Sequence, residues 1–282
     1  MKDDGRTITF RERDFKGSRL RCLLATHIPR PKVLEFLSSL AQPHATVSAT
    51  DRYAPSGFLQ PDEAKLGETP GFLCAGDREA ITDWWLAVRR GANTPNWDIA
   101  STCMIGNRKG LLLVEAKAHA EELLPGECCG AKNKANRDRI HGAIAEAEGR
   151  LNAVTDPLGW RHRPGGGRAG SRRLNAVTDP LGWRLSPDSH YQLSNRFAWT
   201  WKLAAIGVPV VLVYLGFLNA ADELGTPFAD YDQWRACLLE YSKGLVPERA
   251  WGTTVQVNGT PFTALIRSAD VNIVADGAGV RA

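Results

Sequence analysis

The sequence predicts an α/β protein with a mixed central β-sheet that helices cover on both faces. Segments of helical periodicity alternate with strongly apolar segments along the chain. Residues 111–114 read Leu-Leu-Leu-Val, and residues 208–217 are rich in β-branched residues. A strand that is apolar at every position is typical of a central strand buried on both faces. We therefore expect one sheet with helices above and below it.

The first clear helix is predicted at residues 77–91. Asp77 suits the N-cap and Gly91 suits the stop signal. Helical spacing places a group of apolar residues on one face, and we expect this face to be buried: Ile81, Trp84, Trp85 and Val88.

A β-hairpin is predicted next. A turn at residues 93–96 precedes a strand at 97–105, and residues 106–109 connect it to a second strand at 110–118. We expect Gly106 to pair with Lys109 across this connection. The apolar run in the second strand predicts a central position in the sheet.

The remaining elements continue the alternation. Helices are predicted at residues 133–151 and 189–206, a long strand at 208–217 and a helix at 231–241. A final hairpin is expected around Asn258-Gly259, a dipeptide that favours tight turns. Together these elements predict a single domain over residues 1–282.

A perfect internal repeat interrupts this pattern. Residues 150–161 recur letter for letter at 173–184, which indicates a tandem duplication within a loop between helices. The segment 150–184 carries seven arginines, so it could contact a phosphate backbone. Because basic tracts of this kind have little specificity, we favour the alternative, an inserted loop of no function.

Composition sets broad limits on function. The chain is 43% apolar and 23% charged, an ordinary globular balance, and its net charge of +4 permits nucleic acid without requiring it. The N-terminus has no apolar run typical of a secretory signal, so we expect a cytoplasmic protein. Residues 207–209, Gly-Val-Pro, interrupt the apolar segment 203–221, so no membrane span is expected. The six cysteines show no paired metal-ligand spacing.

Three charged residues of the hairpin form the candidate site. The expected register sets Asp98 opposite Lys117 and Ala100 opposite Glu115, so Asp98, Glu115 and Lys117 share one face. Two neighbouring carboxylates can hold Mg²⁺ or Mn²⁺ and leave water ligands for exchange. The lysine ammonium can position or help deprotonate an attacking water and offset charge that develops on phosphorus.

The residues alone leave a structural interpretation open. Glu115 and Lys117 follow a four-residue apolar run, and their burial is costly without partners, which is typical of a functional site. However, Glu-x-Lys is a common short pattern. The same residues could form a pair at the solvated end of a strand, with Asp98 in an ordinary salt bridge.

The motif resembles that of a known nuclease superfamily. Asp98, sixteen intervening residues and Glu115-Ala116-Lys117 are similar to the core motif of the PD-(D/E)XK, or restriction-endonuclease-like, nucleases. The resemblance covers about residues 75–220. It implies a restriction-endonuclease-like core and metal-dependent DNA cleavage, with Asp98 and Glu115 as Mg²⁺ or Mn²⁺ ligands and Lys117 as the catalytic lysine.

The chain also departs from the family pattern. Trp97 precedes Asp98 where the family name has proline. Gln192 resembles a glutamine that some branches place on a later helix, and Arg196 stands where those branches have tyrosine. Arg196 could contact phosphate; alternatively, Gln192 is a surface residue and Arg196 is a strand-end salt-bridge partner. Glu79 is the candidate for an accessory acidic residue, unless it only complements the helix dipole.

We therefore expect a metal-dependent nuclease that hydrolyses DNA phosphodiester bonds. The alternatives are a catalytically inactive nuclease-like module for nucleic-acid binding or assembly, and an unrelated α/β scaffold in which the motif is coincidental. An enzyme that cuts both strands would need a second site, which a homodimer supplies. Motifs for DNA sequence recognition, such as a zinc finger or a helix-turn-helix, are absent from the sequence.

Overall fold

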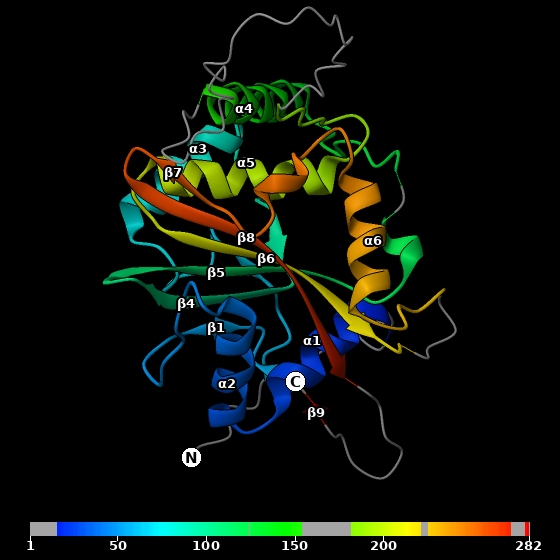
Figure 1. The fold of residues 1–282 in the computed structure, drawn as a ribbon. Helices are drawn as coiled ribbons and strands as arrows, with labels where there is room; N and C mark the ends of the chain where they lie inside the picture. Colours follow the sequence, from blue (N-terminus) through cyan, green and yellow to red (C-terminus); the bar gives the residue numbers. More distant parts are fainter. Residues whose placement is uncertain (1–15, 124, 154–181, 221–224, 272–279, 282) are drawn as a thin grey trace, which may run out of the picture.

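A mixed β-sheet forms the centre of the molecule (Figure 1). The computed structural model describes residues 16–123, 125–153, 182–220, 225–271 and 280–281. The strand order is β1-β4-β5-β6-β8-β7, with β9 paired to β8 and a separate β2-β3 ladder. The strands are β1 (Tyr53–Ala54), β2 (Ala64–Lys65), β3 (Asn96–Trp97), β4 (Ile99–Ile105), β5 (Arg108–Lys117), β6 (Val210–Leu218), β7 (Thr254–Val257), β8 (Thr260–Val271) and β9 (Val280–Arg281).

The sheet combines an antiparallel hairpin with parallel pairs. Strands β4 and β5 are antiparallel, whereas β5 pairs with β6, and β6 with β8, in parallel. The parallel pairs require crossover segments, and helices α4, α5 and α6 lie in those crossovers. The α/β class and the mixed sheet are confirmed.

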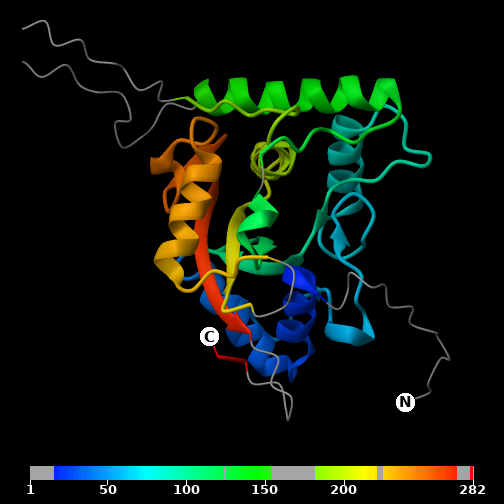
Figure 2. The same ribbon diagram turned by 90° about the vertical axis from the view of Figure 1, so that its right-hand side faces the viewer.

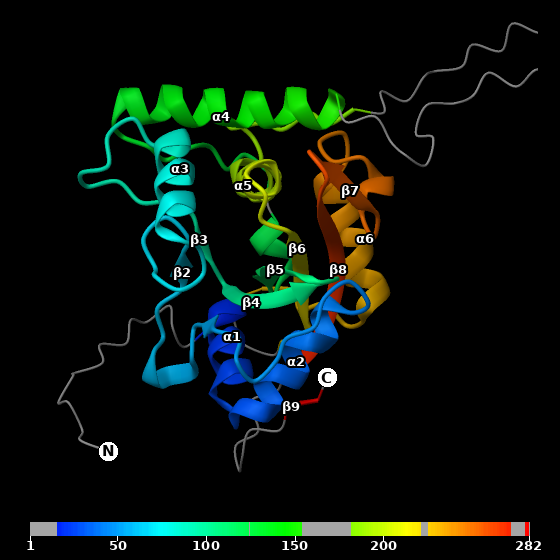
Figure 3. The same ribbon diagram turned by 90° about the vertical axis from the view of Figure 1, so that its left-hand side faces the viewer.

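Helices cover both faces of the sheet (Figure 3). Helices α1 and α2 lie on one face, and α3, α4, α5 and α6 on the other, with a separate hydrophobic cluster on each side. Figure 2 shows α4 crossing over α5, so that α5 is sandwiched between α4 and the sheet. The helices are α1 (Gly17–His27), α2 (Arg30–Ala41), α3 (Ala75–Trp85), α4 (Lys134–Ala153), α5 (Tyr191–Ala205) and α6 (Tyr231–Ser242).

Strand β5 is central, as the apolar run predicts. Leu111 and Leu113 belong to the cluster under α5, and Leu112 and Val114 belong to the cluster on α1 and α2. Because side chains alternate along a strand, the odd-numbered residues that end β5 also face α5. This alternation directs Glu115 and Lys117 into the protein rather than toward a solvated strand end.

The hairpin turn is tighter than predicted. The closing pair is Ile105 with Arg108, so the expected pairing of Gly106 with Lys109 is wrong. Gly106 has φ +60° and opens a two-residue turn. Glycine at the first central position is typical of a type II′ turn, whose twist matches that of the flanking strands.

The tighter turn moves the hairpin register by two residues. Ala100 pairs with Leu113 rather than Glu115, and Ile99 pairs with Val114. Asp98 lies just before β4, outside the paired residues, so its predicted pairing with Lys117 is not formed. Because the shift is even, no side chain of β4 or β5 changes face.

Helix α3 starts and ends earlier than predicted. Its N-cap is Cys74, whose Sγ accepts a hydrogen bond from the Asp77 amide, and its last residue is Trp85. The Asn136 side chain of α4 bonds the Val88 amide at 2.7 Å and the Val88 carbonyl at 2.9 Å. These bonds hold Val88 in extended chain, and its side chain is exposed rather than buried.

The other predicted elements are present with shifts of a few residues. Asn258 and Gly259 have φ of 51° and 74°, typical of a type I′ turn, and they join β7 to β8. Helices α1 and α2 and strand β8 lie outside the range 75–220 that the resemblance covers. Residues 154–161 and 173–181 of the repeat lie outside the described residues.

Among the described residues, no helix combines the length and the apolar character that crossing a bilayer requires.

Candidate functional site

A pocket of about 410 Å³ opens at the C-terminal end of β5. The loop before β4 and the first turns of α5 form its walls, and its volume falls within the range of small-ligand sites. Polar side chains dominate the lining: Glu63, Asn93, Thr94, Asn96, Asp98, Glu127, Tyr191, Gln192, Asn195 and Arg196, together with Pro95.

Glu115 lies behind this pocket and is completely buried. Its Oε1 accepts a hydrogen bond from Lys117 Nζ at 2.7 Å, and its Oε2 accepts one from Arg196 Nε at 2.5 Å. A buried carboxylate is tolerated only with such partners. Burial raises the pKa of Glu115, but the positive charges of Arg196 and Lys117 outweigh it, so the net pKa is lowered.

Lys117 links β5 to α5. Its side chain is nearly buried, and Nζ donates to Glu115 and, at 2.6 Å, to Oε1 of Gln192. Burial lowers the pKa of Lys117, but the carboxylates of Glu115 and Asp98 outweigh burial and hold it above its ordinary value. The ammonium therefore stays charged at neutral pH, which favours positioning and charge stabilisation over proton abstraction from water.

Asp98 is held at the pocket wall by the backbone of the opposite strand. Its Oδ2 accepts a hydrogen bond from the Ala116 amide at 2.7 Å. Burial, with the nearby charges of Glu115 and Glu63, raises the pKa of Asp98 to about 8. Paired acidic groups with pKa values displaced in opposite directions are typical of functional sites.

Arg196 projects from α5 into the same network. It is 5% exposed, and its guanidinium lies 4.5 Å from the centre of the Trp97 ring, a cation–π contact. The tryptophan before Asp98 thus packs against the guanidinium of Arg196. The ion pair with Glu115 near the end of β5 agrees with the predicted alternative of a strand-end salt bridge, and it is buried.

The first turn of α5 is held by a distant residue. The N-cap residue His190 makes no side-chain cap bond. Instead, Glu127 Oε2 accepts from the Gln192 amide at 3.1 Å and the Glu127 carbonyl accepts from the Tyr191 amide at 3.0 Å. These bonds position Gln192, and a carboxylate at this end also complements the helix dipole.

The structure brings together five of the six residues that the sequence singles out: Asp98, Glu115, Lys117, Gln192 and Arg196. Glu79 is not among them. Its side chain is 70% exposed on α3 and lies 3.7 Å from Arg89. Because α3 already starts at Ala75, Glu79 lies beyond the first turn, so the helix-dipole alternative is wrong as well.

The structure adds an acidic residue that sequence reasoning missed. Glu63 lines the pocket beside Asp98 and bonds Arg19 at 2.5 Å and Asn96 at 2.9 Å. It comes from irregular chain before β2, where no periodicity or motif signals a site. Asn195 was also missed, although it lies three residues after Gln192 on the same helix face.

Three further buried residues have structural roles. Trp199 and Trp201 lie in the core under α4. His119 is 1% exposed and its Nε2 lies 3.0 Å from the Ala220 carbonyl.

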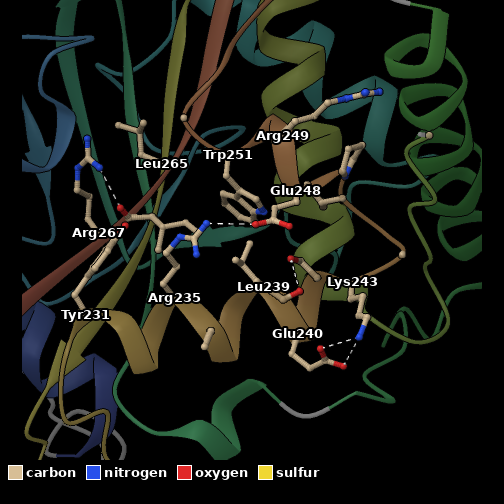
Figure 4. Close-up of a pocket in the computed structure, with 18 residues that line it drawn as sticks. Tyr231, Arg235, Leu239, Glu240, Lys243, Glu248, Arg249, Trp251, Leu265 and Arg267 are labelled. Carbon is tan, nitrogen blue, oxygen red and sulfur yellow. Dashed lines mark hydrogen bonds and ion pairs between the residues drawn. The ribbon is translucent and has the colours of Figure 1, made fainter. Parts of the chain in front are cut away.

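A larger hollow, of about 890 Å³, lies between α6 and β8 (Figure 4). Arg235 pairs with Glu248 at 3.3 Å, and Arg267 bonds backbone carbonyls, as at Gln42. Figure 4 shows the Arg249 guanidinium directed away from that of Arg235. These charged groups do not converge on a common point, so the pocket beside Asp98 is the better candidate for chemistry.

The acidic residues of the pocket suit a hard divalent cation. Among the described residues, no group of three or more His, Cys, Asp or Glu side chains is arranged to hold a metal. Asp98 and Glu115 are two carboxylates at one strand end, and Mg²⁺ commonly takes one or two protein carboxylates while it retains several waters. The oxygen donors therefore fit Mg²⁺ or Mn²⁺, although Lys117 and Arg196 now occupy the Glu115 oxygens.

Comparison of the chain with models of protein families, with curated proteins and with solved structures found no match.

Proposed function

We propose that the chain is a metal-dependent nuclease that hydrolyses DNA phosphodiester bonds at the pocket beside Asp98. The observation that carries the proposal is the buried Glu115–Lys117 pair at 2.7 Å, which bonds Gln192 beside the pocket that Asp98 lines. Burial of opposite charges costs free energy that an apolar pair would not, so its presence at a pocket favours a chemical role.

The residues have distinct roles in this proposal. Asp98 and Glu115 would hold Mg²⁺ or Mn²⁺, which, when bound, supplies a water nucleophile and a Lewis acid for phosphorus chemistry. Lys117 stays protonated and stabilises the negative charge that develops on phosphate oxygens. Gln192 fixes the ammonium through the 2.6 Å bond to its Oε1.

A second candidate follows from the state of Glu115. Both its oxygens are already bonded to cationic groups, so Glu115, Lys117 and Arg196 form a set in which the buried carboxylate is compensated without added metal. This set favours a nuclease-like module that binds nucleic acid, or assembles with other proteins, without cleavage. A metal-binding measurement separates the two candidates.

The test is cleavage of labelled single-stranded and duplex DNA with Mg²⁺ or Mn²⁺. Wild type is compared with Asp98→Asn, Glu115→Gln and Lys117→Ala, all shown to be folded by circular dichroism. Lys109→Ala is the matched control, because Lys109 is an exposed lysine at the other end of the same strand.

Loss of cutting in the three site variants, with activity kept in Lys109→Ala, supports the proposal. Equal cutting by Lys117→Ala and wild type refutes the assignment. If wild type does not cut, calorimetry with Mg²⁺ or Mn²⁺ decides: binding that Asp98→Asn abolishes keeps the metal site, whereas no binding favours the non-cleaving module.

A further inference from the structure

Four carboxamide side chains line the pocket beside Asp98: Asn93, Asn96, Gln192 and Asn195. A carboxamide has a donor end and an acceptor end that are nearly indistinguishable by shape, so its orientation has to be fixed by its partners. Three of these carboxamides accept a hydrogen bond from a lysine or arginine, which can only donate. The fourth, Asn96, donates to the carboxylate of Glu63, which can only accept when ionised.

The partners therefore fix which end remains available. Gln192 Oε1 accepts from Lys117 Nζ at 2.6 Å, and Asn195 Oδ1 accepts from Arg196 Nη1 at 3.0 Å. Ammonium and guanidinium groups donate only, so both acceptor ends are engaged. The NH₂ ends of Gln192 and Asn195 make no hydrogen bond to any described residue.

Asn195 is the more informative of the two. Asn195 is only 4% exposed, yet the protein does not fully enclose its Nδ2. The small exposed part of this residue therefore includes a donor group at the pocket. A nearly buried amide donor without a partner is costly unless a ligand or solvent satisfies it.

The two donors lie on one face of α5. Residues three apart on a helix are neighbours, and Gln192 and Asn195 both line the pocket with Asp98. Asn93 is similar, because its Oδ1 accepts from Lys65 Nζ at 3.1 Å and its NH₂ end remains available. Such a set of neutral donors matches an oxygen-rich anion such as a phosphodiester.

The carboxylates of the pocket are compatible with this ligand. Glu63 is paired with Arg19 at 2.5 Å, and Arg196 lies next to Asn195 on the helix. Asp98 would bind the divalent cation, or a proton in its absence. Glu127 is exposed and already accepts from the α5 backbone.

We propose that Asn195 is a substrate-binding residue whose Nδ2 donates to a non-bridging oxygen of the DNA phosphodiester, beside Gln192. This inference rests on the proposed function for the identity of the ligand. It assigns recognition of the phosphate to neutral amide donors of α5 rather than to a basic surface. Phosphate recognition by such donors carries no sequence information.

The test is binding of short fluorescein-labelled DNA, single-stranded and duplex, measured by anisotropy with Ca²⁺ in place of Mg²⁺. Asn195→Asp keeps the acceptor for Arg196 and replaces the donor with a negative oxygen. Asn195→Ala removes both ends without a charge. Asn107→Asp is the matched control, because it adds the same charge in the exposed hairpin turn at the far end of β5.

We expect Asn195→Asp to weaken DNA binding by about tenfold to a hundredfold, the value of a hydrogen bond to a charged group, and Asn195→Ala by about tenfold. Asn107→Asp should bind like wild type. Cleavage by wild type with unchanged binding in both Asn195 variants would overturn this inference and leave the nuclease proposal intact. DNA binding that depends on Asn195, without cleavage by wild type, would keep the inference and reject the nuclease proposal. Failure of wild type to bind DNA would overturn the inference about Asn195.

Discussion

Replacement of Asp98 by Asn should stabilise the protein at neutral pH. Burial and the charges of Glu115 and Glu63 raise the pKa of Asp98 from 3.8 to about 8. The unfolded chain releases this proton near pH 3.8, whereas the folded chain retains it to about pH 8. Stability is therefore lost as pH rises through this window. Asparagine does not ionise, so it does not lose stability as the pH rises, and its Oδ1 can still accept a hydrogen bond from the Ala116 amide.

The size of the effect follows from the pKa difference. Each pH unit between the two values contributes about 1.36 kcal/mol, so the interval from pH 3.8 to pH 7 gives about 4 kcal/mol at most. Asp98 is partly exposed at the pocket wall, and solvent screening reduces this value. We expect the stability advantage of Asp98→Asn to grow by about 2 kcal/mol from pH 4 to pH 7.

The assay is urea unfolding of wild type and Asp98→Asn at several pH values between 4 and 9. Asp62→Asn serves as the control, because it removes the same charge at an exposed position. The difference in unfolding free energy between wild type and Asp62→Asn should not grow comparably with pH. A constant difference between wild type and Asp98→Asn across this range, or a variant that loses stability as pH rises, would refute the reasoning.

Three further predictions test the site and its supports. Below about pH 8 a divalent cation must displace the Asp98 proton, so the apparent Kd for Mg²⁺ should fall about tenfold per pH unit from pH 6 to pH 7, as measured by calorimetry; a pH-independent Kd would contradict this. Gly216→Ala places a Cβ 2.5 Å from Trp234 Cδ2 and should cost about 1 to 3 kcal/mol of unfolding free energy in urea; wild-type stability would mean that α6 moves freely. Asn136→Ala leaves the Val88 backbone groups unpaired and should cost roughly 2 kcal/mol and speed hydrogen exchange at the Val88 amide, and unchanged exchange would count against it.

The sequence predicted those parts of the fold that interactions between neighbouring residues determine. The apolar run of β5 and the Asn258-Gly259 turn follow from side-chain alternation and backbone preference, which act within a few residues. The end of α3 depends on Asn136, which lies 48 residues from Val88 in the chain. Such tertiary bonds have no local signature.

The candidate site was predictable to the extent that it lies on regular elements. Glu115 and Lys117 share one face of β5 as predicted, because the error in the hairpin register was an even number of residues. Asp98 lies outside the paired strand, but its side chain still reaches the backbone of β5. The bonds of Arg196 to Glu115 and of Gln192 to Lys117 could not be predicted, because neither spacing nor charge shows which strand a helix faces. Glu63 was missed because irregular chain carries no periodicity.

The bond between Glu115 and Arg196 has a consequence for synthesis of the chain. The two residues are 81 positions apart, so at about 5 to 20 residues per second the ribosome needs roughly 4 to 16 s to deliver the arginine after the glutamate. Until then Glu115 lacks one of its two cationic partners, and burial of the end of β5 is unfavourable. The nascent β4–β5 hairpin therefore has to wait, with its apolar face uncovered, for α5 to emerge. This interval is when the chain is most open to aggregation and to capture by a chaperone.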